Sequence, residues 1–516
     1  MTQEYDAIVI GSGLGGLTAG ALYARAGAKV LLLERNVAFG GAATTYRHGN
    51  LTIEASLHET TDPRTTLDPK GQVFEALDLY TDIEFVPVGN FYEVRSALLG
   101  EPFTLPDGYD AIEKALIARF PHQEKGVKAF LRQMKRSQRA LDFLSPGHNA
   151  LWRLTHIADL PLELWSVIRD MRSSLSDVFQ RYFGDDEAIK FAIAANLSYY
   201  TDDPDSFWWL GFTIAQSGYM QGGGHYIKGG SGQLSNRLAE IIREEGGETL
   251  NRREAISIDV GEDGVKTVRH RSLPGGEESA ARAPVIFANA APHKIAEMLP
   301  EDQSADFMAP FRDKPLSISL FSATLGLDKR PADLGLKAYS TILIPDWMEK
   351  FSDYKRSGDL MAGEPDGAVP AMAVIDYSRI ESGLPEDKLF PVSITCVDRE
   401  ANWRGLDKTA YQQKRSAWLD VLIKRLDAEW PGFAAAVKEK TISTARTMKE
   451  YLNTPEGAIY GFALTPPKEM LKGPPEMTQT SVDGLWIASA YGGFGGFTGA
   501  MGVGAEAARE ALRQKS

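Results

Sequence analysis

The sequence predicts an α/β fold, and three glycine-rich segments lead to this prediction. The first follows a short apolar run at residues 6–10 and precedes an alanine-rich helical stretch. The second, at residues 222–231, and the third, at residues 492–504, also lead into helix-like stretches. A strand, a glycine turn and a helix in succession are typical of parallel α/β units. We therefore expect a parallel sheet whose strands come from both ends and the middle of the chain.

Composition and charge exclude several classes of protein. The chain has 516 residues, of which 43% are hydrophobic, so it can form several domains and is not expected to be disordered. Its formal net charge of −13 offers no broad positive field, so we expect no nucleic-acid partner. Cys396 is the single cysteine, which excludes an internal disulfide framework and indicates a buried core thiol in a reducing compartment.

The sequence shows no pattern typical of a targeting signal or of a metal site. There is no uncharged apolar run of about 18 residues, and the N-terminal segment has no basic region typical of a signal peptide. We therefore expect a cytoplasmic protein. The eight histidines show no HExxH or other metal-ligand spacing, so no metal is expected.

The first glycine segment has the features of a dinucleotide-binding βαβ unit. Its turn consists of Gly11, Ser12, Gly13, Leu14, Gly15 and Gly16. Gly11 permits the tight turn, Gly13 lets the backbone approach a pyrophosphate, and Gly16 lets helix and strand pack closely. The helix N-terminus offers free N–H groups to the phosphates. Glu34 ends the next apolar run and can bind both ribose hydroxyls, which is compatible with NAD as well as with FAD.

A second glycine pair distinguishes between these two cofactors. Gly40, Gly41 and Ala42 follow Glu34 and Arg35 after a short spacing. Together the two motifs resemble those of a large FAD-dependent oxidoreductase family, which includes amine oxidases, phytoene desaturases, carotenoid isomerases and retinol saturases. In that family the second pair packs on the cofactor's diphosphate. The resemblance therefore implies FAD as the cofactor.

The middle glycine segment looks like the second cofactor segment of the phytoene desaturase group. It is followed by a helix-like run at residues 234–245, a strand near Ala255 and a strand that ends in Asn289 and Ala290. By this resemblance the backbone near Ala255 faces the adenine. The same resemblance places Asn289 and Ala290 near the flavin.

The C-terminal segment completes the resemblance. A buried strand leads to Ser489 and Ala490, which stand where many relatives have Gly-Asp, so the contact of that acid is lost or supplied by Ser489. The residues that match the family's segment beside the flavin are Gly499, Ala500 and Met501. In the family, the dipole of the helix that follows, here residues 505–513, faces the pyrimidine end of the flavin.

These segments imply a discontinuous Rossmann-type FAD-binding domain with a mixed-sheet substrate domain and a helical insert. The expected division is FAD-binding parts at 1–107, 221–300 and 456–516, a helical insert at 108–220, and a substrate domain at 301–455. The insert is rich in aromatic residues and leucine, and residues 181–183 resemble a desaturase Arg-Tyr-Phe triplet. Such an insert can be plain core, can wall a substrate tunnel, or can contact a bilayer.

The catalytic candidates lie in residues 51–63, which look like the family segment that runs past the isoalloxazine. His58 falls on a histidine that retinol saturases carry there, and Ser56 is expected beside the cofactor. An imidazole of near-neutral pKa at His58 can exchange the proton that accompanies hydride transfer; otherwise it hydrogen-bonds the backbone beside the flavin. A buried Glu59 with a raised pKa can protonate a C=C bond or stabilise a carbocation; otherwise it forms a salt bridge or meets solvent. His225 is a weaker third candidate.

We interpret the chain as an FAD-dependent oxidoreductase that acts on C=C or allylic C–H bonds of an apolar polyene. The substrate is expected to be a carotenoid, a retinoid or an unsaturated acyl lipid. The reaction is desaturation, saturation or cis–trans isomerisation, by hydride transfer at flavin N5. The electron acceptor or donor stays open, and peripheral contact with the inner face of a membrane is expected. The alternatives are an FAD-dependent amine oxidase and a non-catalytic FAD-containing lipid-binding protein.

Overall fold

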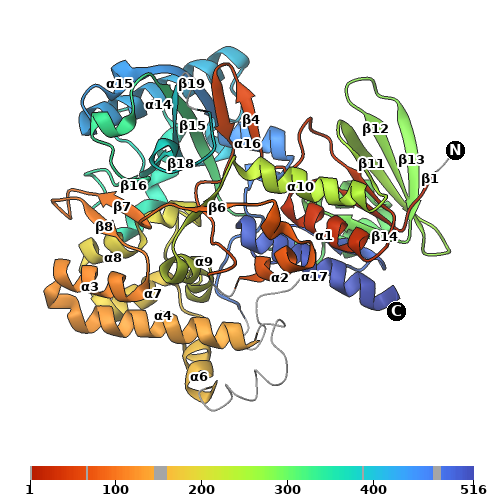
Figure 1. Ribbon diagram of the computed structural model, residues 1–516, viewed down its shortest axis with the longest axis horizontal. Coiled ribbons are helices and arrows are strands. Elements are labelled where there is room, and N and C mark those ends of the chain that lie inside the picture. Colours follow the sequence, from red (N-terminus) through yellow and green to blue (C-terminus); the bar gives the residue numbers. More distant parts are fainter. Residues whose placement is uncertain (1–2, 66–67, 145–159, 386–388, 469–477, 516) are drawn as a thin grey trace.

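The computed structural model describes residues 3–65, 68–144, 160–385, 389–468 and 478–515 (Figure 1). These residues form a five-stranded, a four-stranded and a seven-stranded sheet, together with two two-stranded ribbons. Figure 1 shows the first two sheets on one side of the molecule, and the seven-stranded sheet on the other side above a group of helices. The predicted α/β fold class is confirmed.

The five-stranded sheet is assembled from three distant parts of the chain. Its order is β10-β3-β2-β14-β20, and all neighbouring strands are parallel. The strands are β2 (Ala7–Ile10), β3 (Val30–Leu33), β10 (Glu248–Leu250), β14 (Val285–Ala288) and β20 (Leu485–Ile487). β2, β3 and β20 are apolar and buried along their whole length, as expected for parallel strands with both faces covered. The parallel sheet is therefore discontinuous in the sequence, as predicted.

Three helices pack together beside this sheet. α1 (Leu14–Arg25) lies against both α10 (Ser231–Glu244) and α17 (Gly496–Lys515). A Cβ on Gly504 would lie 2.1 Å from the carbonyl oxygen of Gly15. The backbones of α1 and α17 therefore approach so closely at this crossing that no side chain fits between them.

The third glycine segment is mostly helical, although the sequence predicted a glycine loop ahead of a helix at residues 505–513. α17 already begins at Gly496. Glycine disfavours a helix interior by about 1 kcal/mol relative to alanine, so a pattern with so many glycines indicates a loop. The close contact with α1, which only glycine permits, overrides this local preference.

The four-stranded sheet adjoins the parallel sheet near Glu34, the residue that follows β3. Its order is β1-β13-β12-β11. The strands are β1 (Gln3–Glu4), β11 (Arg253–Val260), β12 (Lys266–Ser272) and β13 (Glu278–Ala283). The N–H group of Arg253 donates to the carbonyl oxygen of Glu34 at 2.7 Å, which joins the start of β11 to the end of β3. Two helices, α11 (Pro292–Met298) and α12 (Glu301–Met308), follow β14.

The seven-stranded sheet is mixed, with order β19-β15-β18-β17-β16-β7-β8. Within this sheet β16 and β7 pair in parallel, and all the other neighbouring strands are antiparallel. The strands are β7 (Tyr92–Arg95), β8 (Phe103–Leu105), β15 (Ser319–Leu327), β16 (Ser340–Leu343), β17 (Met372–Asp376), β18 (Phe390–Asp398) and β19 (Val437–Ser443). The helices of this region are α13 (Tyr354–Ser357), α14 (Lys408–Glu429), α15 (Phe433–Ala436) and α16 (Ala445–Leu452). Cys396 is fully buried on β18, in agreement with the expected core thiol.

The predicted insert is helical throughout its described residues. Its helices are α3 (Tyr109–Arg119), α4 (Glu124–Leu144), α6 (Leu160–Asp170), α7 (Leu175–Phe183), α8 (Glu187–Ala194) and α9 (Trp209–Gly222). Many of its aromatic residues form ordinary core, for example Phe130 with its ring 5.5 Å from that of Trp209. Residues 145–159 of the insert lie outside the described residues. The division into domains stays a prediction.

Two ribbons and one helix connect these parts. The ribbons pair β4 (Thr45–His48) with β5 (Leu51–Glu54), and β6 (Phe85–Pro87) with β9 (His225–Ile227). α2 (Pro69–Ala76) packs against α17. The chain between β5 and α2 carries the catalytic candidates. It leads from β5, which contacts β18 of the seven-stranded sheet, to α2, which packs against α17 beside the five-stranded sheet.

Candidate functional site

A cavity of about 1920 Å³ lies where the parallel sheet, the seven-stranded sheet and the helical insert meet. Its wall includes Gly13 of the first glycine turn, Thr395 of β18 and Tyr219 of α9. Ligand pockets usually measure roughly 300–1,000 Å³. The cavity is thus large enough to hold a cofactor and a substrate side by side.

Most of the residues predicted to bind a cofactor line this one cavity. Those on its wall are Gly11, Ser12, Gly13, Gly15, Glu34, Arg35, Gly40, Gly41, Ala42, Ser56, Ala255, Asn289, Ala290, Ser489, Ala490, Gly499 and Ala500. Two predicted residues lie apart from the wall. Gly16 makes the close helix–strand approach that was expected of it, since a Cβ there would lie 2.5 Å from the carbonyl oxygen of Gly11. Met501 is fully buried in apolar core, because successive helical residues point in directions about 100° apart.

The carboxylate of Glu34 is held at the end of β3 beside the glycine turn. Its Oε2 atom accepts hydrogen bonds from the N–H group of Ser12 at 2.9 Å and from the hydroxyl of Ser12 at 2.5 Å. Its Oε1 atom accepts from the N–H group of Asn36 at 2.6 Å. A carboxylate offers about four acceptor positions, so capacity is left for a ligand in the cavity.

The side chain of Asn289 holds the first glycine turn in place by hydrogen bonds. Its Oδ1 atom accepts from the N–H group of Gly13 at 2.8 Å, and its side-chain amide donates to the carbonyl oxygen of Ala488 at 2.6 Å. The resemblance predicted that Asn289 lies near the flavin, and this stays a prediction. In the structure its side chain joins the ends of β14 and β20 to the glycine turn. The second glycine pair lies beside the same turn, because the N–H group of Gly40 donates to the carbonyl oxygen of Ser12 at 2.9 Å.

Six buried polar atoms on the cavity wall have no hydrogen-bond partner within the described part of the chain. Two of them are Nη1 of Arg253 and Oγ of Ser489. Buried polar groups are normally hydrogen-bonded, so a ligand with acceptor atoms satisfies both of them. Together with Glu34 and the glycine turn, these atoms fit a dinucleotide such as FAD.

Glu54 is a positioning residue beside the segment that carries the catalytic candidates. Its buried carboxylate accepts hydrogen bonds from the N–H group and the hydroxyl of Ser231, at 2.8 and 2.6 Å. It also accepts from the hydroxyl of Thr45 at 2.9 Å and from the N–H group of Leu57 at 3.1 Å. Glu54 thereby ties the first turn of α10 to the segment that carries His58.

His58 is buried and held by two hydroxyl groups. Its Nδ1 atom lies 3.1 Å from the hydroxyl of Tyr377, and its Nε2 atom lies 3.1 Å from the hydroxyl of Thr395. Burial lowers the pKa of His58 to about 4, so the imidazole is neutral at pH 7. This differs from the near-neutral pKa expected for an acid–base role, and the partners are side-chain hydroxyls rather than the backbone. His58 also lines the cavity.

We expect His58 to make the protein less stable as the pH falls from 6.5 toward 4. In that window the unfolded chain binds a proton on this residue and the folded chain does not, so the free energy of unfolding decreases. Between pH 6.5 and pH 5 the loss is about 2 kcal/mol. Urea unfolding of wild type and His58→Gln at pH 7 and pH 5 measures it. His58→Gln should lose less stability than wild type, whereas His48→Gln, on the exposed β4, should behave as wild type. Equal losses in all three proteins would show that His58 takes up no proton on unfolding.

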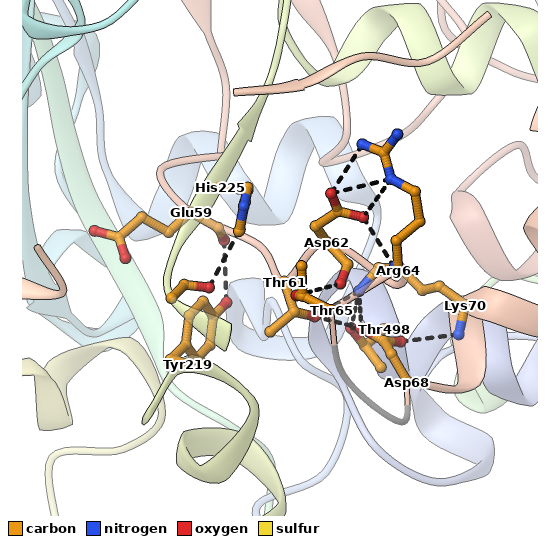
Figure 2. Close-up of polar contacts among 11 residues, drawn as sticks. Glu59, Thr61, Asp62, Arg64, Thr65, Asp68, Lys70, Tyr219, His225 and Thr498 are labelled. Atoms are coloured by element: carbon orange, nitrogen blue, oxygen red, sulfur yellow. Dashed lines mark hydrogen bonds and ion pairs between the residues drawn. The ribbon is translucent and has the colours of Figure 1, made fainter. Parts of the chain in front are cut away.

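Glu59 projects into the aromatic part of the cavity. Its Oε2 atom is buried and has no hydrogen-bond partner among the residues the structure describes. Burial raises the pKa of Glu59 well above its usual value, the negative field of Asp107 raises it further, and a hydrogen bond from Ser340 acts in the opposite direction. Burial therefore favours the protonated, uncharged form of Glu59, in the direction that its candidate role as an acid requires. Figure 2 shows its side chain directed away from the polar cluster around Lys70.

Aromatic and aliphatic side chains surround this end of the cavity. Those on its wall are Phe91, Tyr92, Tyr199, Tyr200, Tyr219, Leu320, Ile459, Tyr460, Phe462 and Phe494. The ring of Tyr219 stacks on that of Phe91 at 5.2 Å, and its hydroxyl donates to the backbone carbonyl of Glu59 at 3.1 Å (Figure 2). The third candidate, His225, pairs through its backbone with Thr60, and its ring lies within 3.3 Å of the carbonyl oxygen of Gly223. Its side chain is not part of the cavity wall.

A buried polar cluster that sequence reasoning missed joins α2 to α17 (Figure 2). The ammonium group of Lys70, whose side chain is 1% exposed, forms an ion pair with Asp68, whose side chain is 3% exposed. It also donates to the hydroxyls of Thr61 at 2.9 Å and Thr498 at 2.5 Å. The cluster thus anchors the segment after Glu59 to the first turn of α17. Nothing in the local sequence around Lys70 indicates Thr498 as its partner.

Metal-ligand clusters and membrane-spanning helices are absent from the described residues. No cluster of three or more His, Cys, Asp or Glu side chains that could hold a metal ion is found among them. None of the helices in the described ranges is long and apolar enough to cross a membrane.

Comparison with known proteins shows similarity over nearly the whole chain. Residues 9–70 match the model of an NAD(P)-binding Rossmann-like domain. A chloroplastic prolycopene isomerase from Daucus carota is 25% identical over 100% of this chain and 82% of its own length. An all-trans-retinol 13,14-reductase from Danio rerio is 26% identical over 89% of this chain and 78% of its own. A neurosporene-forming phytoene desaturase from Rhodobacter capsulatus is 27% identical over 94% and 89%.

Solved structures show the same fold at lower identity. A putrescine oxidase bound to putrescine superposes with a TM-score of 0.63 at 15% identity, covering 99% of this chain and 100% of that one. Cyclohexylamine oxidase from Brevibacterium oxydans gives 0.60 at 16% identity, covering 99% of both chains. The chain is therefore homologous to the enzyme group of prolycopene isomerases, retinol 13,14-reductases and phytoene desaturases, and it has the fold of amine-oxidase-type flavoenzymes.

Proposed function

We propose that the chain is an FAD-dependent oxidoreductase that adds a proton to a C=C bond of an apolar polyene, in saturation or cis–trans isomerisation. The observation that carries this proposal is the buried carboxyl of Glu59, placed in an aromatic cavity that is continuous with a dinucleotide-type glycine turn. Desaturation, the reverse chemistry, needs a proton acceptor instead. Burial weakens His58 as a base and favours the protonated form of Glu59, so both shifts favour proton donation over proton uptake from the substrate.

The cofactor end of the cavity would hold FAD through four groups of residues. Glu34 would bind the ribose, and the glycine turn with the first turn of α1 would bind the diphosphate. Arg253 and Ser489 would satisfy their free polar atoms on further acceptor atoms of the cofactor. When bound, FAD supplies the hydride chemistry. The chain's own residues orient the substrate, exclude water and move the proton.

The substrate end favours a long unsaturated hydrocarbon over an amine. Its wall is built from aromatic and aliphatic side chains, which bind an extended apolar chain without charge recognition. A protonated Glu59 carries no charge to attract an ammonium group. The likeness to amine oxidases is one of fold, at 14–16% identity, and brings no substrate with it.

The direct test is conversion of polyenes by the FAD-loaded protein under anaerobic conditions. An all-trans retinoid, a poly-cis carotenoid and an unsaturated fatty acid are each added to the oxidised and to the dithionite-reduced protein, and the products are analysed by chromatography. We expect a saturated or isomerised product with the reduced protein. Bleaching of the flavin by an amine, with no polyene converted in either state, would support the amine oxidase alternative instead. Bound FAD that reacts with neither class would support the non-catalytic alternative.

An exposed apolar patch on the helical insert is suited to membrane contact. On α6, Trp165 is 63% exposed and Ile168 is 45% exposed, and on the neighbouring α9 Ile214 is 37% exposed and lines the cavity. Figure 1 shows α6 projecting from the helical side of the molecule. This patch would let an apolar substrate pass from the inner face of a bilayer into the cavity.

We expect the protein to float with liposomes at low and at high salt, and the double variant Trp165→Ser, Ile168→Ser to float less. Burial of a large apolar side chain contributes roughly 1.5–3 kcal/mol, so loss of two such side chains should weaken binding strongly. Val37→Ser, which removes another exposed apolar side chain far along the sequence, is the matched control. Flotation that is absent, or is the same in all variants, would rule out the patch as a membrane contact.

A further inference from the structure

We infer that Asp107 delivers protons from solvent to Glu59 across the backbone of Gly223 and Gly224. The inference rests on the proposed role of Glu59 as a proton donor, because a donor in an apolar cavity must be recharged after each turnover. It adds to that role a second residue and a route, which neither the cavity wall nor the sequence pattern indicates.

Two consecutive glycines separate the two carboxyl groups. A Cβ on Gly224 would lie 2.5 Å from Oε2 of Glu59, and a Cβ on Gly223 would lie 2.5 Å from Oδ2 of Asp107. Both carboxyl groups therefore lie against the same short piece of backbone at the end of α9, where the two glycines themselves contribute no side chain. Any other residue at either position would push a carboxyl group away.

The two carboxyl groups differ in where they face. Glu59 lines the cavity, whereas Asp107 is not on its wall and lies in the loop between β8 and α3 with a partly exposed side chain. Asp107 is thus the member of the pair that solvent can reach. Glu59 is the member that a substrate can reach.

Each carboxyl group has a buried oxygen without a partner in the described ranges. These are Oε2 of Glu59 and Oδ1 of Asp107. Buried oxygens of this kind normally bind hydrogen from a protein group or from an ordered water. A proton shared along the gap, directly or through one water molecule, gives both atoms a partner.

The charges around the pair set the direction of transfer. The titratable groups that face Glu59 are Asp107 and the tyrosines Tyr92, Tyr199, Tyr200, Tyr219 and Tyr339, which come from β7, the segment after α8, α9 and the residue before β16. Burial raises the pKa of Asp107 to about 6, and burial together with the negative field of Asp107 raises the pKa of Glu59 well above its usual value. A Glu59 carboxylate left behind by proton donation is therefore disfavoured beside Asp107 and takes up a proton again.

The step is a proton transfer without change of oxidation state. Glu59 gives its carboxyl proton to a substrate carbon and is left as a carboxylate. The O–H bond of protonated Asp107 breaks as a new O–H bond forms at Oε2 of Glu59. Asp107, now a carboxylate, takes a proton from solvent water.

The test is the rate of hydrogen–deuterium exchange at the Glu59 carboxyl group, measured by infrared spectroscopy of the FAD-loaded protein without substrate. Its C=O band is assigned as the band that Glu59→Gln removes. We expect Asp107→Asn to slow exchange of this band by roughly tenfold or more. Asp110→Asn removes a carboxylate from the exposed first turn of α3 and should exchange as wild type does.

Two further variants separate the loss of the carboxyl group at position 107 from a failure to fold. Asp107→Glu keeps the carboxyl group and should restore fast exchange, and Asp107→Ser replaces Asp107→Asn if the latter does not fold. Exchange in Asp107→Asn as fast as in wild type would overturn the relay. A wild-type protein that shows the Glu59 band and fast exchange but converts no polyene would overturn the proposed function and leave the relay in place.

Discussion

Replacing Glu59 by glutamine is expected to abolish polyene conversion while FAD stays bound. The expected fall in turnover is about 10²–10⁴-fold, the usual contribution of a positioned general acid. The amide has nearly the same shape as the carboxylic acid but cannot give up a proton at neutral pH. Because the carboxyl is uncharged in the wild type, the substitution also leaves the charge inside the cavity unchanged.

The measurement is single-turnover product formation by the reduced protein, with the flavin absorbance recorded in the same sample. Glu75→Gln is the matched control, since Glu75 also lines the cavity but is exposed to solvent on α2. It should convert the substrate at the wild-type rate. A Glu59→Gln protein that keeps FAD and turns over normally would show that another group supplies the proton.

Replacing Lys70 by methionine is expected to destabilise the fold by about 3–5 kcal/mol. The change leaves the buried carboxylate of Asp68 without its cation, and it removes the donor to the hydroxyls of Thr61 and Thr498. Burial already lowers the pKa of Lys70, which reflects the cost of keeping this ammonium group out of water. Urea unfolding at pH 7 measures the loss.

The double variant Asp68→Asn, Lys70→Met tests the reason for this loss. Removing both charges leaves no isolated buried ion, so we expect much of the lost stability to return. Lys128→Met is the control, because Lys128 pairs with Glu124 on the exposed surface of α4, where loss of an ion pair should hardly change stability. A Lys70→Met protein as stable as the Lys128→Met protein would contradict the importance of the cluster.

Local features of the sequence predicted the cofactor side of the molecule well. The first glycine turn, the following helix and the strand that ends in Glu34 lie within about thirty consecutive residues, so their pattern is complete in one short segment. In the substrate domain, β15, β17 and β18 likewise coincide with apolar runs in the sequence. Alternation of apolar and polar residues and continuous apolar runs both indicate, within a short segment, which residues are buried.

Features set by distant parts of the chain were predicted less well. The low pKa of His58 depends on an environment completed by Tyr377 and Thr395, which follow it by more than 300 residues. The bond between Lys70 and Thr498 spans 428 residues. The proposed relay from Asp107 to Glu59 depends on Gly223, which lies against Asp107, and on Gly224, which lies against Glu59. Such contacts follow from tertiary packing, and no spacing in the sequence encodes them.

The central claim is that the cavity beside the glycine turn holds FAD. The most direct test is to purify the protein, add FAD, remove the unbound cofactor, and identify and quantify what acid releases. We predict an equimolar amount of FAD, and much less for Glu34→Ala, which loses the carboxylate held by Ser12 and Asn36. A wild-type protein that retains no flavin after this treatment would contradict the assignment of the cavity and of the chemistry built on it.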